Sequence, residues 1–437
     1  MLHGARAYVR VDQSRPTIAM GLFFHGGRLF EDESNYGITE LMLRTMWRSV
    51  KSRWDYQTGE EVPRGQEVTL SAEQVIMKLE QLGGQLRWVN EPDFFGFILH
   101  VLSRNQDQAL RLLVDIVERP LFDETEVQRA RAELLYELRH RSPRPVDLAW
   151  RALVGEHVYS VPPWGRVETV EQLTPERLRD WHRQTIGRQY PLVIIVGDTD
   201  GSTLISTIIA RQFHRREIQR TFRAQIPQLP PAPRQQTATS RTPALAIGFL
   251  VPAHQVVERE IFDVIEQILV GPGGQLTESL RDRRGLAYRV GARFDPRALA
   301  SAFFIWMTPR ATGQAEALAE VRRYVQRLVT GPMDEEMVAL GINAAISAQR
   351  DRLQAHPARV LAYARRAFLG ERPVDVEHYA ERLGQLTGQK IHAVAAQYLK
   401  WERRGVGRLQ GPSRPRTTPP SPVTDSEEHR PSSAAFR

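Results

Sequence analysis

The chain has 437 residues, of which 41% are hydrophobic, and a net charge of +8. This length exceeds one ordinary hydrophobic core and suits two domains of about 200 residues each. The absence of cysteine excludes disulfides, thiolate zinc sites and thiol nucleophiles. No apolar run approaches the roughly 18 residues that a membrane helix needs, and no apolar leader follows Met1. We therefore expect a cytoplasmic protein without membrane insertion.

Arginine carries most of the positive charge and is spread through helical stretches with acidic residues nearby, as at residues 129–131 and 322–323. Nucleic-acid binding requires clustered Lys and Arg that neutralise phosphates. The dispersed pattern instead suits solvated faces and protein interfaces. We expect no nucleic acid, and an acidic peptide is the better electrostatic match.

The first elements are predicted to be strands. Apolar and polar residues alternate from residue 5 to about residue 30 with a turn between, which predicts a β-hairpin. A helix is expected to follow from Asn35. Residues 51–68 contain Gly and Pro and show no period, so we expect an inserted, mobile surface loop.

Helices dominate the next part of the chain. Ser71-Ala-Glu-Gln predicts a capped helix that ends at residues 83–84, and two more helices are predicted across residues 105–140. An extended apolar stretch from Phe94 lies between them. This mixture, with mainly antiparallel strands, predicts an α+β fold.

The two halves of the chain share a pattern. Gln172-Leu-Thr opens a helix before a buried strand at residues 190–198, and Gln385-Leu-Thr opens a helix before a weaker strand at residues 405–409. Only two copies fit, so we predict a duplicated domain rather than a solenoid. The expected division is a domain at residues 1–214, a proline-containing linker at 215–242, a domain at 243–410 and a disordered tail at 411–437.

Several segments together resemble the pitrilysin or insulinase-type (M16) family of zinc peptidases, which carry an inverted His-x-x-Glu-His motif. The resemblance covers about Leu2 to Leu409 and depends on the segments occurring in family order. It implies two homologous α+β domains, each with a mainly antiparallel sheet packed by helices, in a clam-shell around a central chamber. The segments are FHGGRLFEDESNYGITE from residue 24, KLEQLGG from 78, PLFDETEV from 120, TVEQLT from 169 and LVGPGGQLTESLRDRRGLAY from 269.

In this family two histidines at i and i+4 on one helix bind zinc, and the glutamate between them activates water. Alignment on Gly37 places the motif on Glu40-Leu-Met-Leu-Arg44. Glu40 and Arg44 replace the histidines and Leu43 replaces the base, so the resemblance implies no metal and no catalytic residue in this chain. Glu137 matches the third ligand, and we interpret it as an ordinary charged helix residue. Alternatively, the Arg44 guanidinium lies where the metal would be and neutralises Glu40 or Glu137.

The resemblance also assigns two substrate-binding candidates, Arg281 and Tyr288, which match residues that reach the substrate from the second domain in related proteases. Arginine offers a fork of donors to a peptide carbonyl, and a tyrosine hydroxyl can donate to an oxyanion. The alternatives are a helix-terminus cation for Arg281 and a packed strand aromatic for Tyr288. Gly285, between them, is expected to end a helix in the left-handed region.

The leading hypothesis is a non-catalytic subunit that pairs with a zinc-bearing sister chain, as in mitochondrial processing peptidase and bacterial heterodimers of this family. It would enclose an extended, unstructured peptide added as a strand to a sheet edge. The second hypothesis is a structural or peptide-binding protein like the respiratory-complex core subunits of this fold. The third is an enzyme with a Mg²⁺ or Ca²⁺ site built from carboxylates, namely Glu31, Glu33, Glu40 and Glu137.

Overall fold

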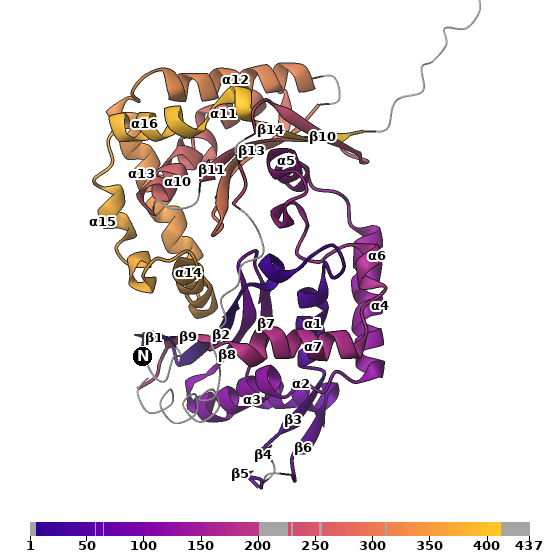
Figure 1. Ribbon diagram of the computed structural model, residues 1–437. Helices are drawn as coiled ribbons and strands as arrows, with labels where there is room; N and C mark the ends of the chain where they lie inside the picture. The colour runs from indigo at the N-terminus through magenta and orange to yellow at the C-terminus, as the bar shows by residue number, and fades with distance from the viewer. Residues whose placement is uncertain are drawn as a thin grey trace, which may run out of the picture.

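The computed structural model describes residues 6–56, 58–63, 65–200, 226–228, 230–252, 256–310 and 313–411. Figure 1 shows two halves that each contain a sheet and several helices, the first coloured indigo to magenta and the second pink to yellow. The predicted α+β class with two sheet-bearing halves is confirmed.

The first half contains β1 (Arg6–Val11), β2 (Thr17–His25), η1 (Gly27–Phe30), α1 (Ile38–Met46), β3 (Ser49–Ser52), β4 (Trp54–Asp55), β5 (Glu60–Glu61), β6 (Val68–Ser71), α2 (Ala72–Gln81), β7 (Gln85–Asn90), β8 (Phe94–Leu102), η2 (Ser103–Asn105), α3 (Gln106–Glu118), α4 (Glu124–His140), α5 (Pro145–Val154), η3 (Val158–Ser160), α6 (Val167–Val170), α7 (Pro175–Thr185), η4 (Ile186–Arg188) and β9 (Leu192–Gly197). The second half contains β10 (Arg234–Thr239), β11 (Ala244–Pro252), α10 (Val256–Val270), α11 (Gln275–Thr277), the π-helical η6 (Glu278–Arg283), β12 (Ala287–Asp295), β13 (Ala300–Pro309), α12 (Gln314–Thr330), α13 (Glu335–Arg352), α14 (His356–Phe368), η7 (Pro373–Val376), α15 (Tyr379–Leu383), α16 (Gly388–Tyr398), η8 (Trp401–Arg403) and β14 (Gly405–Gln410).

The two five-stranded sheets have the same topology. Their strand orders are β1-β9-β2-β8-β7 and β10-β14-β11-β13-β12, so the second sheet repeats the first strand for strand. In each sheet the pair at one edge is parallel and the remaining pairs are antiparallel. The repeated topology confirms the predicted duplication.

The predicted hairpin of the first two strands is wrong. Strand β9 lies between β1 and β2, pairing parallel with β1 and antiparallel with β2. All six residues of β9 are buried, so both of its faces and both of its edges need neighbours. The short turn after Val11 predicted pairing between adjacent strands, but the apolar strand nearly 200 residues later takes that place.

The halves exchange one helix each. Helix α5 packs on β10, β11 and β14 of the second sheet, and α14 packs on β2, β8 and β9 of the first. Glycines make both contacts close: a Cβ at Gly407 would lie 1.9 Å from the Pro145 carbonyl oxygen, and one at Gly21 would lie 2.7 Å from a Val360 methyl carbon. A division of the chain at residue 214 therefore does not separate the two cores.

Two segments differ from the expected loops. Part of the predicted linker forms β10, which pairs with β14, whereas residues 215–225 and 229 lie outside the described residues, as does the tail beyond residue 411. The insertion at 51–68 forms paired strands, β3 with β6 and β4 with β5, and residues 57 and 64 are outside the described part. The arm projects from the first half in Figure 1.

A cluster of buried charges joins the halves where α5 and the β7–β8 turn meet the β12–β13 turn. Tyr159 donates its hydroxyl to Asp93, and the other Asp93 oxygen accepts from the backbone N–H of Ala298 at 2.9 Å. Arg297 donates to the Tyr159 carbonyl at 2.9 Å, and its guanidinium lies 3.8 Å from the ring centre of Trp150 on α5. These contacts fix the relative position of the two sheets.

Candidate functional site

Helix α1 carries Glu40, Leu43 and Arg44, the positions that the resemblance aligns with the zinc motif, and a buried carboxylate lies at the start of this helix. Gly37 precedes the helix with φ of 95°, in the region that favours glycine. The Glu31 side chain accepts from the backbone N–H of Gly37 at 3.0 Å and of Thr39 at 3.1 Å. Glu31 therefore caps the first turn, where a negative charge is favourable, and is not available as a metal ligand.

Arg44 lies between the two remaining carboxylates of the site. Its Nε donates to Glu40 at 2.8 Å along α1, and its two terminal nitrogens donate to the two oxygens of Glu137 on α4 at 2.7 and 2.9 Å. This fork-to-fork arrangement is the strongest geometry available to an arginine and a carboxylate. The alternative hypothesis paired Arg44 with Glu40 or Glu137, and in the structure Arg44 contacts both, so Glu137 is not merely a solvated helix residue.

Two residues of the edge strand β7 complete the site, and the sequence analysis missed both. The indole N–H of Trp88 donates to Glu40 at 3.3 Å, and the side-chain amide of Asn90 donates to its other oxygen at 3.0 Å. The Arg44 guanidinium also lies 5.7 Å from the Trp88 ring centre. Their spacing of two residues in a strand was the available signal, because such residues share a face.

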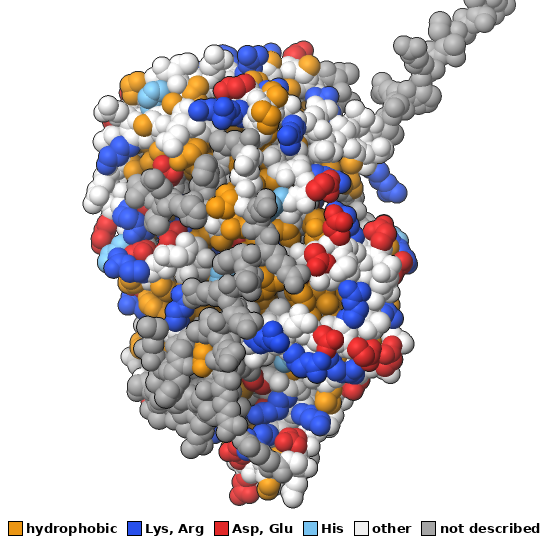
Figure 2. Space-filling model, in the orientation of Figure 1, with side chains coloured by type: hydrophobic (Ala, Val, Ile, Leu, Met, Phe, Trp, Pro, Cys, Tyr) orange, Lys and Arg blue, Asp and Glu red, His pale blue; other side chains and the backbone are white. Residues whose placement is uncertain are grey.

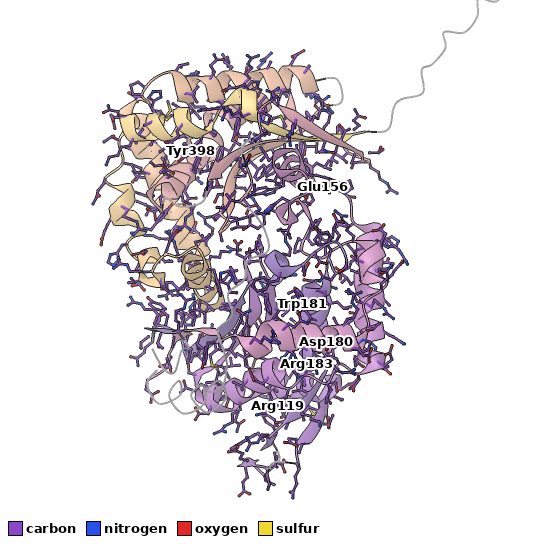
Figure 3. The ribbon with its side chains drawn as sticks, in the orientation of Figure 1. Arg119, Glu156, Asp180, Trp181, Arg183 and Tyr398 are labelled. Atoms are coloured by element: carbon purple, nitrogen blue, oxygen red, sulfur yellow. The ribbon has the colours of Figure 1, made fainter. Side chains whose placement is uncertain are left out.

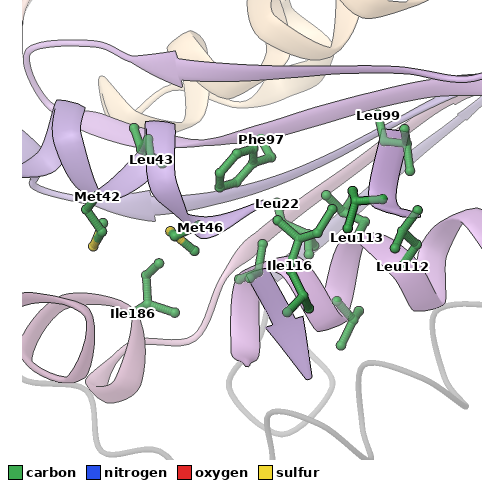
Figure 4. Packing of buried hydrophobic residues seen from close by; sticks show 14 of the residues in the cluster. Leu22, Met42, Leu43, Met46, Phe97, Leu99, Leu112, Leu113, Ile116 and Ile186 are labelled. Atoms are coloured by element: carbon green, nitrogen blue, oxygen red, sulfur yellow. The ribbon is translucent and has the colours of Figure 1, made fainter. Parts of the chain in front are cut away.

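Leu43, at the position of the catalytic base, belongs to the hydrophobic core. Its side chain is 0% exposed, and Figure 4 shows it beside Phe97 with Met42 and Met46 on the same helix. The aliphatic side chain can neither accept a proton nor hold a water molecule. No general base therefore occupies this position.

The charged side chains of this site pair with one another. Burial disfavours the charge on Arg44, but its hydrogen bonds to Glu137 and Glu40 outweigh burial and raise the pKa of Arg44 above its usual value. The hydrogen bond from Arg44 lowers the pKa of Glu137, although partial burial opposes this. The guanidinium thus stays charged and the Glu137 carboxylate stays ionised at neutral pH.

The residues at this position do not fit zinc. Structural and catalytic zinc sites use His, Cys and carboxylate ligands with at least three from the protein, whereas here a permanent cation fills the space between the two carboxylates. The carboxylate site for Mg²⁺ or Ca²⁺ is also wrong, because Glu31 caps α1 and Arg44 holds Glu40 and Glu137. Within the part of the chain that the structure describes, no three His, Asp or Glu side chains gather in a way that could hold a metal ion.

Arg281 and Tyr288 lie in the second half, at the end of η6 and the start of the edge strand β12. Both side chains are open to solvent: Arg281 is 55% exposed and pairs with its neighbour Asp282, and Tyr288 is 76% exposed. The β12–β13 register shifts between Ala287 and Arg289, and such a bulge can turn a side chain outward. Tyr288 is thus not a packed strand aromatic, and these two residues make only local contacts.

A pocket of about 480 Å³ lies beside α7 in the first half. Its floor includes Trp181, whose indole N–H donates to the Thr39 hydroxyl at 3.1 Å. Figure 3 shows Asp180, Trp181 and Arg183 on this helix. Two of its charged lining residues are already engaged: Asp180 pairs with Arg183, and Arg177 donates to the Ser34 carbonyl at 2.8 Å.

Comparisons with known proteins agree with this geometry. A family model described as the peptidase M16 inactive domain matches residues 172–344, and a model described as insulinase (peptidase family M16) matches residues 68–161. The insulinase match begins after α1, the helix that carries the lost motif positions. In the described residues, no helix is long and apolar enough to cross a membrane.

Curated relatives include an uncharacterized zinc protease of Mycobacterium tuberculosis, 23% identical over 368 residues, which span 79% of this chain and 80% of that protein. An uncharacterized zinc protease of Rickettsia bellii is 21% identical over 348 residues, 74% of this chain and 75% of the relative. These percentages place the chain among distant relatives that share most of its length.

Similar solved structures include a protease from Helicobacter pylori, with a TM-score of 0.80, 16% identity and coverage of 93% of this chain and 97% of that one. A peptidase M16 inactive domain from Pseudomonas fluorescens has a TM-score of 0.79, 17% identity and coverage of 94% and 96%. A chain of complex III2 from Candida albicans has a TM-score of 0.72, 13% identity and coverage of 92% and 93%. At these identities the likeness concerns the fold alone.

Proposed function

We propose that this chain, which belongs to the M16 peptidase family, is the non-catalytic subunit of a heterodimeric zinc metallopeptidase. One observation carries the proposal: Arg44, at a position that the resemblance aligns with a metal ligand, is held by Glu40 and Glu137. The zinc then belongs to the partner, and this subunit encloses and positions an extended peptide. We place the complex in the cytoplasm.

In this proposal the isolated chain hydrolyses no peptide, because Arg44 occupies the site and is bonded to Glu40 and Glu137. Zinc could bind only by displacing the guanidinium, which would leave a cation without its partners in a mostly buried place, since the Arg44 side chain is 11% exposed. Leu43 supplies no base. The site therefore acts as a structural contact between α1, α4 and β7.

The open edges of the two sheets support peptide binding. Among the described residues, β7 and β12 are each the last strand of their sheet, and an extended peptide can add to such an edge as a further strand. Tyr288 and Arg281 lie at the start of β12 with exposed polar ends. In our proposal they donate hydrogen bonds to the peptide carbonyl and oxyanion in the partner's active site.

The test is a peptidase assay on the isolated chain and on its complex with a zinc-bearing M16 chain from the same genome. We expect no hydrolysis of unstructured peptides by the isolated chain and chelator-sensitive hydrolysis by the complex. Arg281→Ala and Tyr288→Phe should each lower kcat about 10²-fold or more in the complex. Chelator-sensitive cleavage by the isolated chain would disprove the proposal.

Matched controls separate this effect from a loss of assembly. Arg283→Ala removes another exposed arginine of η6, which pairs with Glu278, and Tyr136→Phe removes the hydroxyl of a tyrosine that is 65% exposed on α4. Both variants should leave kcat unchanged, and all four should form the complex to the same extent in size-exclusion chromatography.

A structural or peptide-binding role without proteolysis is the second candidate, favoured by the similarity to a chain of complex III2. It predicts that the chain joins a stable assembly whose other members lack peptidase activity. In that case Arg281→Ala and Tyr288→Phe leave every peptidase in the assembly unaffected. The kcat measurement above therefore distinguishes the two candidates.

A further inference from the structure

One continuous face of α7 and η4 lines the pocket of about 480 Å³ in the first half, which we call the α7 pocket. Six of its lining residues recur at the spacing of one helix face, namely Arg177, Asp180, Trp181, Gln184, Thr185 and Arg188. A helix face that packs on a core is normally apolar, whereas five of these six residues are polar. Figure 2 shows basic and acidic side chains together on the surface where α7 lies in Figure 1. This polar stripe therefore borders a hollow of the surface.

Three contacts hold α7 and η4 against the segment between β2 and α1, which forms the opposite wall. Arg177 bonds to this segment at one end of the pocket. On the floor, the Trp181 indole donates to the Thr39 hydroxyl at 3.1 Å. At the other end, the Gln189 side chain accepts from the His25 backbone N–H at 3.1 Å and donates to the His25 carbonyl at 3.0 Å. The pocket is therefore preformed, as most small-molecule sites are.

Two donors of the lining have no acceptor among the described residues. Arg188 lines the pocket and makes no hydrogen bond or ion pair within the described part of the chain. Asn35 lies on the opposite wall. Because its side-chain oxygen accepts from the backbone N–H of Asp32 at 2.7 Å, its amide nitrogen is left to donate. An arginine fork and a planar amide together suit a planar acceptor such as a carboxylate.

The charges around the pocket favour an anion with a single charge. Asp180, the acidic residue of the lining, pairs with Arg183. Asp32 and Glu33 belong to the segment of the opposite wall but do not line the pocket, and Asp32 accepts hydrogen bonds from its neighbour Ser34. The one unpaired arginine of the lining is therefore matched by a carboxylate, and less well by a phosphate ester, whose charge is about −2.

Apolar side chains form the rest of the lining. Trp181 and Ile38 are buried, and Phe30 lies beside them at the end of η1. The Phe30 ring stacks on the His25 ring, with ring centres 6.5 Å apart. Such a surface binds an apolar group by removing it from water, at about 25 cal/mol per Å² of apolar area.

We propose that the α7 pocket binds an organic carboxylate that carries an apolar body. Arg188 and the Asn35 amide hold the carboxylate, and the apolar body packs on Trp181 and Phe30. The C-terminal residue of a peptide and a free carboxylic acid share this chemistry. The inference goes beyond the proposed function, because it concerns the isolated chain and needs no zinc-bearing partner.

The test uses the isolated full-length chain and two probes that differ in one group, N-acetyl-L-phenylalanine and its amide. Calorimetric titration should show the acid binding at least about tenfold more tightly than the amide, because only the carboxylate gains charge-assisted hydrogen bonds from Arg188. Equal affinity for the two probes, or binding of neither, would overturn the proposal.

Arg188→Gln should lower the affinity for the acid about tenfold and leave the affinity for the amide unchanged. Because Arg188 is exposed, this variant should fold with an unchanged unfolding temperature. Arg104→Gln removes an exposed arginine of η2 that does not line the pocket. It is the matched control and should change neither affinity. Unchanged binding of the acid in the Arg188 variant would refute the site.

Two further probes identify the source of the carboxylate. N-acetyl-Ala-Ala-Phe with a free C-terminal carboxylate represents a peptide end, and hydrocinnamate represents a free acid. Tighter binding of the tripeptide supports the site as one for peptide C-termini, and tighter binding of hydrocinnamate supports it as one for free acids. Binding of neither would overturn the carboxylate site itself.

Discussion

Acidic side chains lie at two partly or fully buried sites in this molecule, and their pKa values shift in opposite directions at the two sites. At the lost zinc position, Arg44 satisfies Glu40 and Glu137 with three hydrogen bonds and lowers the pKa of Glu137. In a cavity between the halves, which Asp263 and Glu266 of α10 line, burial raises the pKa of both carboxyl groups, and Asp263 raises that of Glu266 further. At the first site the ion pairs outweigh the effect of burial on the carboxylate, whereas at the second site burial outweighs the attraction of the nearby Arg259, Arg352 and Arg293.

The largest expected effect comes from Arg44→Met, which removes the cation and leaves Glu40 and Glu137 unpaired. We expect the free energy of unfolding to fall by about 2–4 kcal/mol, less than for a fully buried pair because Glu137 is partly exposed. Urea denaturation measures the loss. Arg139→Met removes an arginine that is 57% exposed and should cost no more than about 0.5 kcal/mol; an equal loss in both variants would contradict the comparison.

A second prediction restores the ligands. The double substitution Glu40→His and Arg44→His places two imidazoles one turn apart opposite Glu137, a set that suits zinc. At a zinc concentration about 100 times the dissociation constant, binding should stabilise the variant by about 2.7 kcal/mol. Thermal unfolding with zinc and with EDTA measures it, and the unsubstituted chain should show no difference. If the variant folds but zinc does not raise its unfolding temperature, then α1 and α4 do not place the two imidazoles and Glu137 where they can bind one metal ion together.

The cavity predicts a pH dependence of the opposite sign to that of an ordinary ion pair. The folded-state pKa of Glu266 is about 7 against 4.5 for the free side chain, with Asp263, Arg352 and Arg293 as the charged groups facing it. The unfolded chain therefore loses this proton first, and stability falls as pH rises through that interval. Glu266→Gln removes the loss, so its stability relative to the unsubstituted chain should grow by about 1–3 kcal/mol between about pH 5 and about pH 8. A constant difference would contradict the raised pKa.

The smallest expected effect is that of Glu137→Gln. Because Arg44 lowers the pKa of Glu137, this carboxylate stabilises the fold above its unfolded pKa of about 4.5, and the contribution is lost as pH falls below that value. We expect a cost of about 0.5–1.5 kcal/mol at neutral pH that shrinks in acid. Denaturation curves of the Glu137→Gln variant and the unsubstituted chain at several pH values test this. A loss of unfolding free energy that grows as pH falls would contradict the lowered pKa of Glu137.

The secondary structure could be predicted where local signals were strong. Ser71 and Gln74 form the predicted capping box of α2, and Gly285 adopts the predicted left-handed backbone with φ of 57°. The pairing of β1 with β9 and the exchange of α5 and α14 could not be predicted in this way. Both depend on contacts between residues far apart in the chain, which no local pattern encodes.

The sequence by itself indicated the family and the repeat of one pattern in the two halves, and by the resemblance it predicted that Glu40, Leu43 and Arg44 replace a zinc motif, because these inferences depend on residue types at fixed spacings. It also offered, as the alternative to an ordinary helix residue at Glu137, a pairing of Arg44 with Glu40 or Glu137, since an unpaired buried carboxylate is costly. Only the tertiary structure decided that the bond to Glu137 is bidentate and that Trp88 and Asn90 hold Glu40. The cavity was likewise invisible in the sequence, because its carboxylates and aromatic rings come from both halves and meet only when the two sheets pack together.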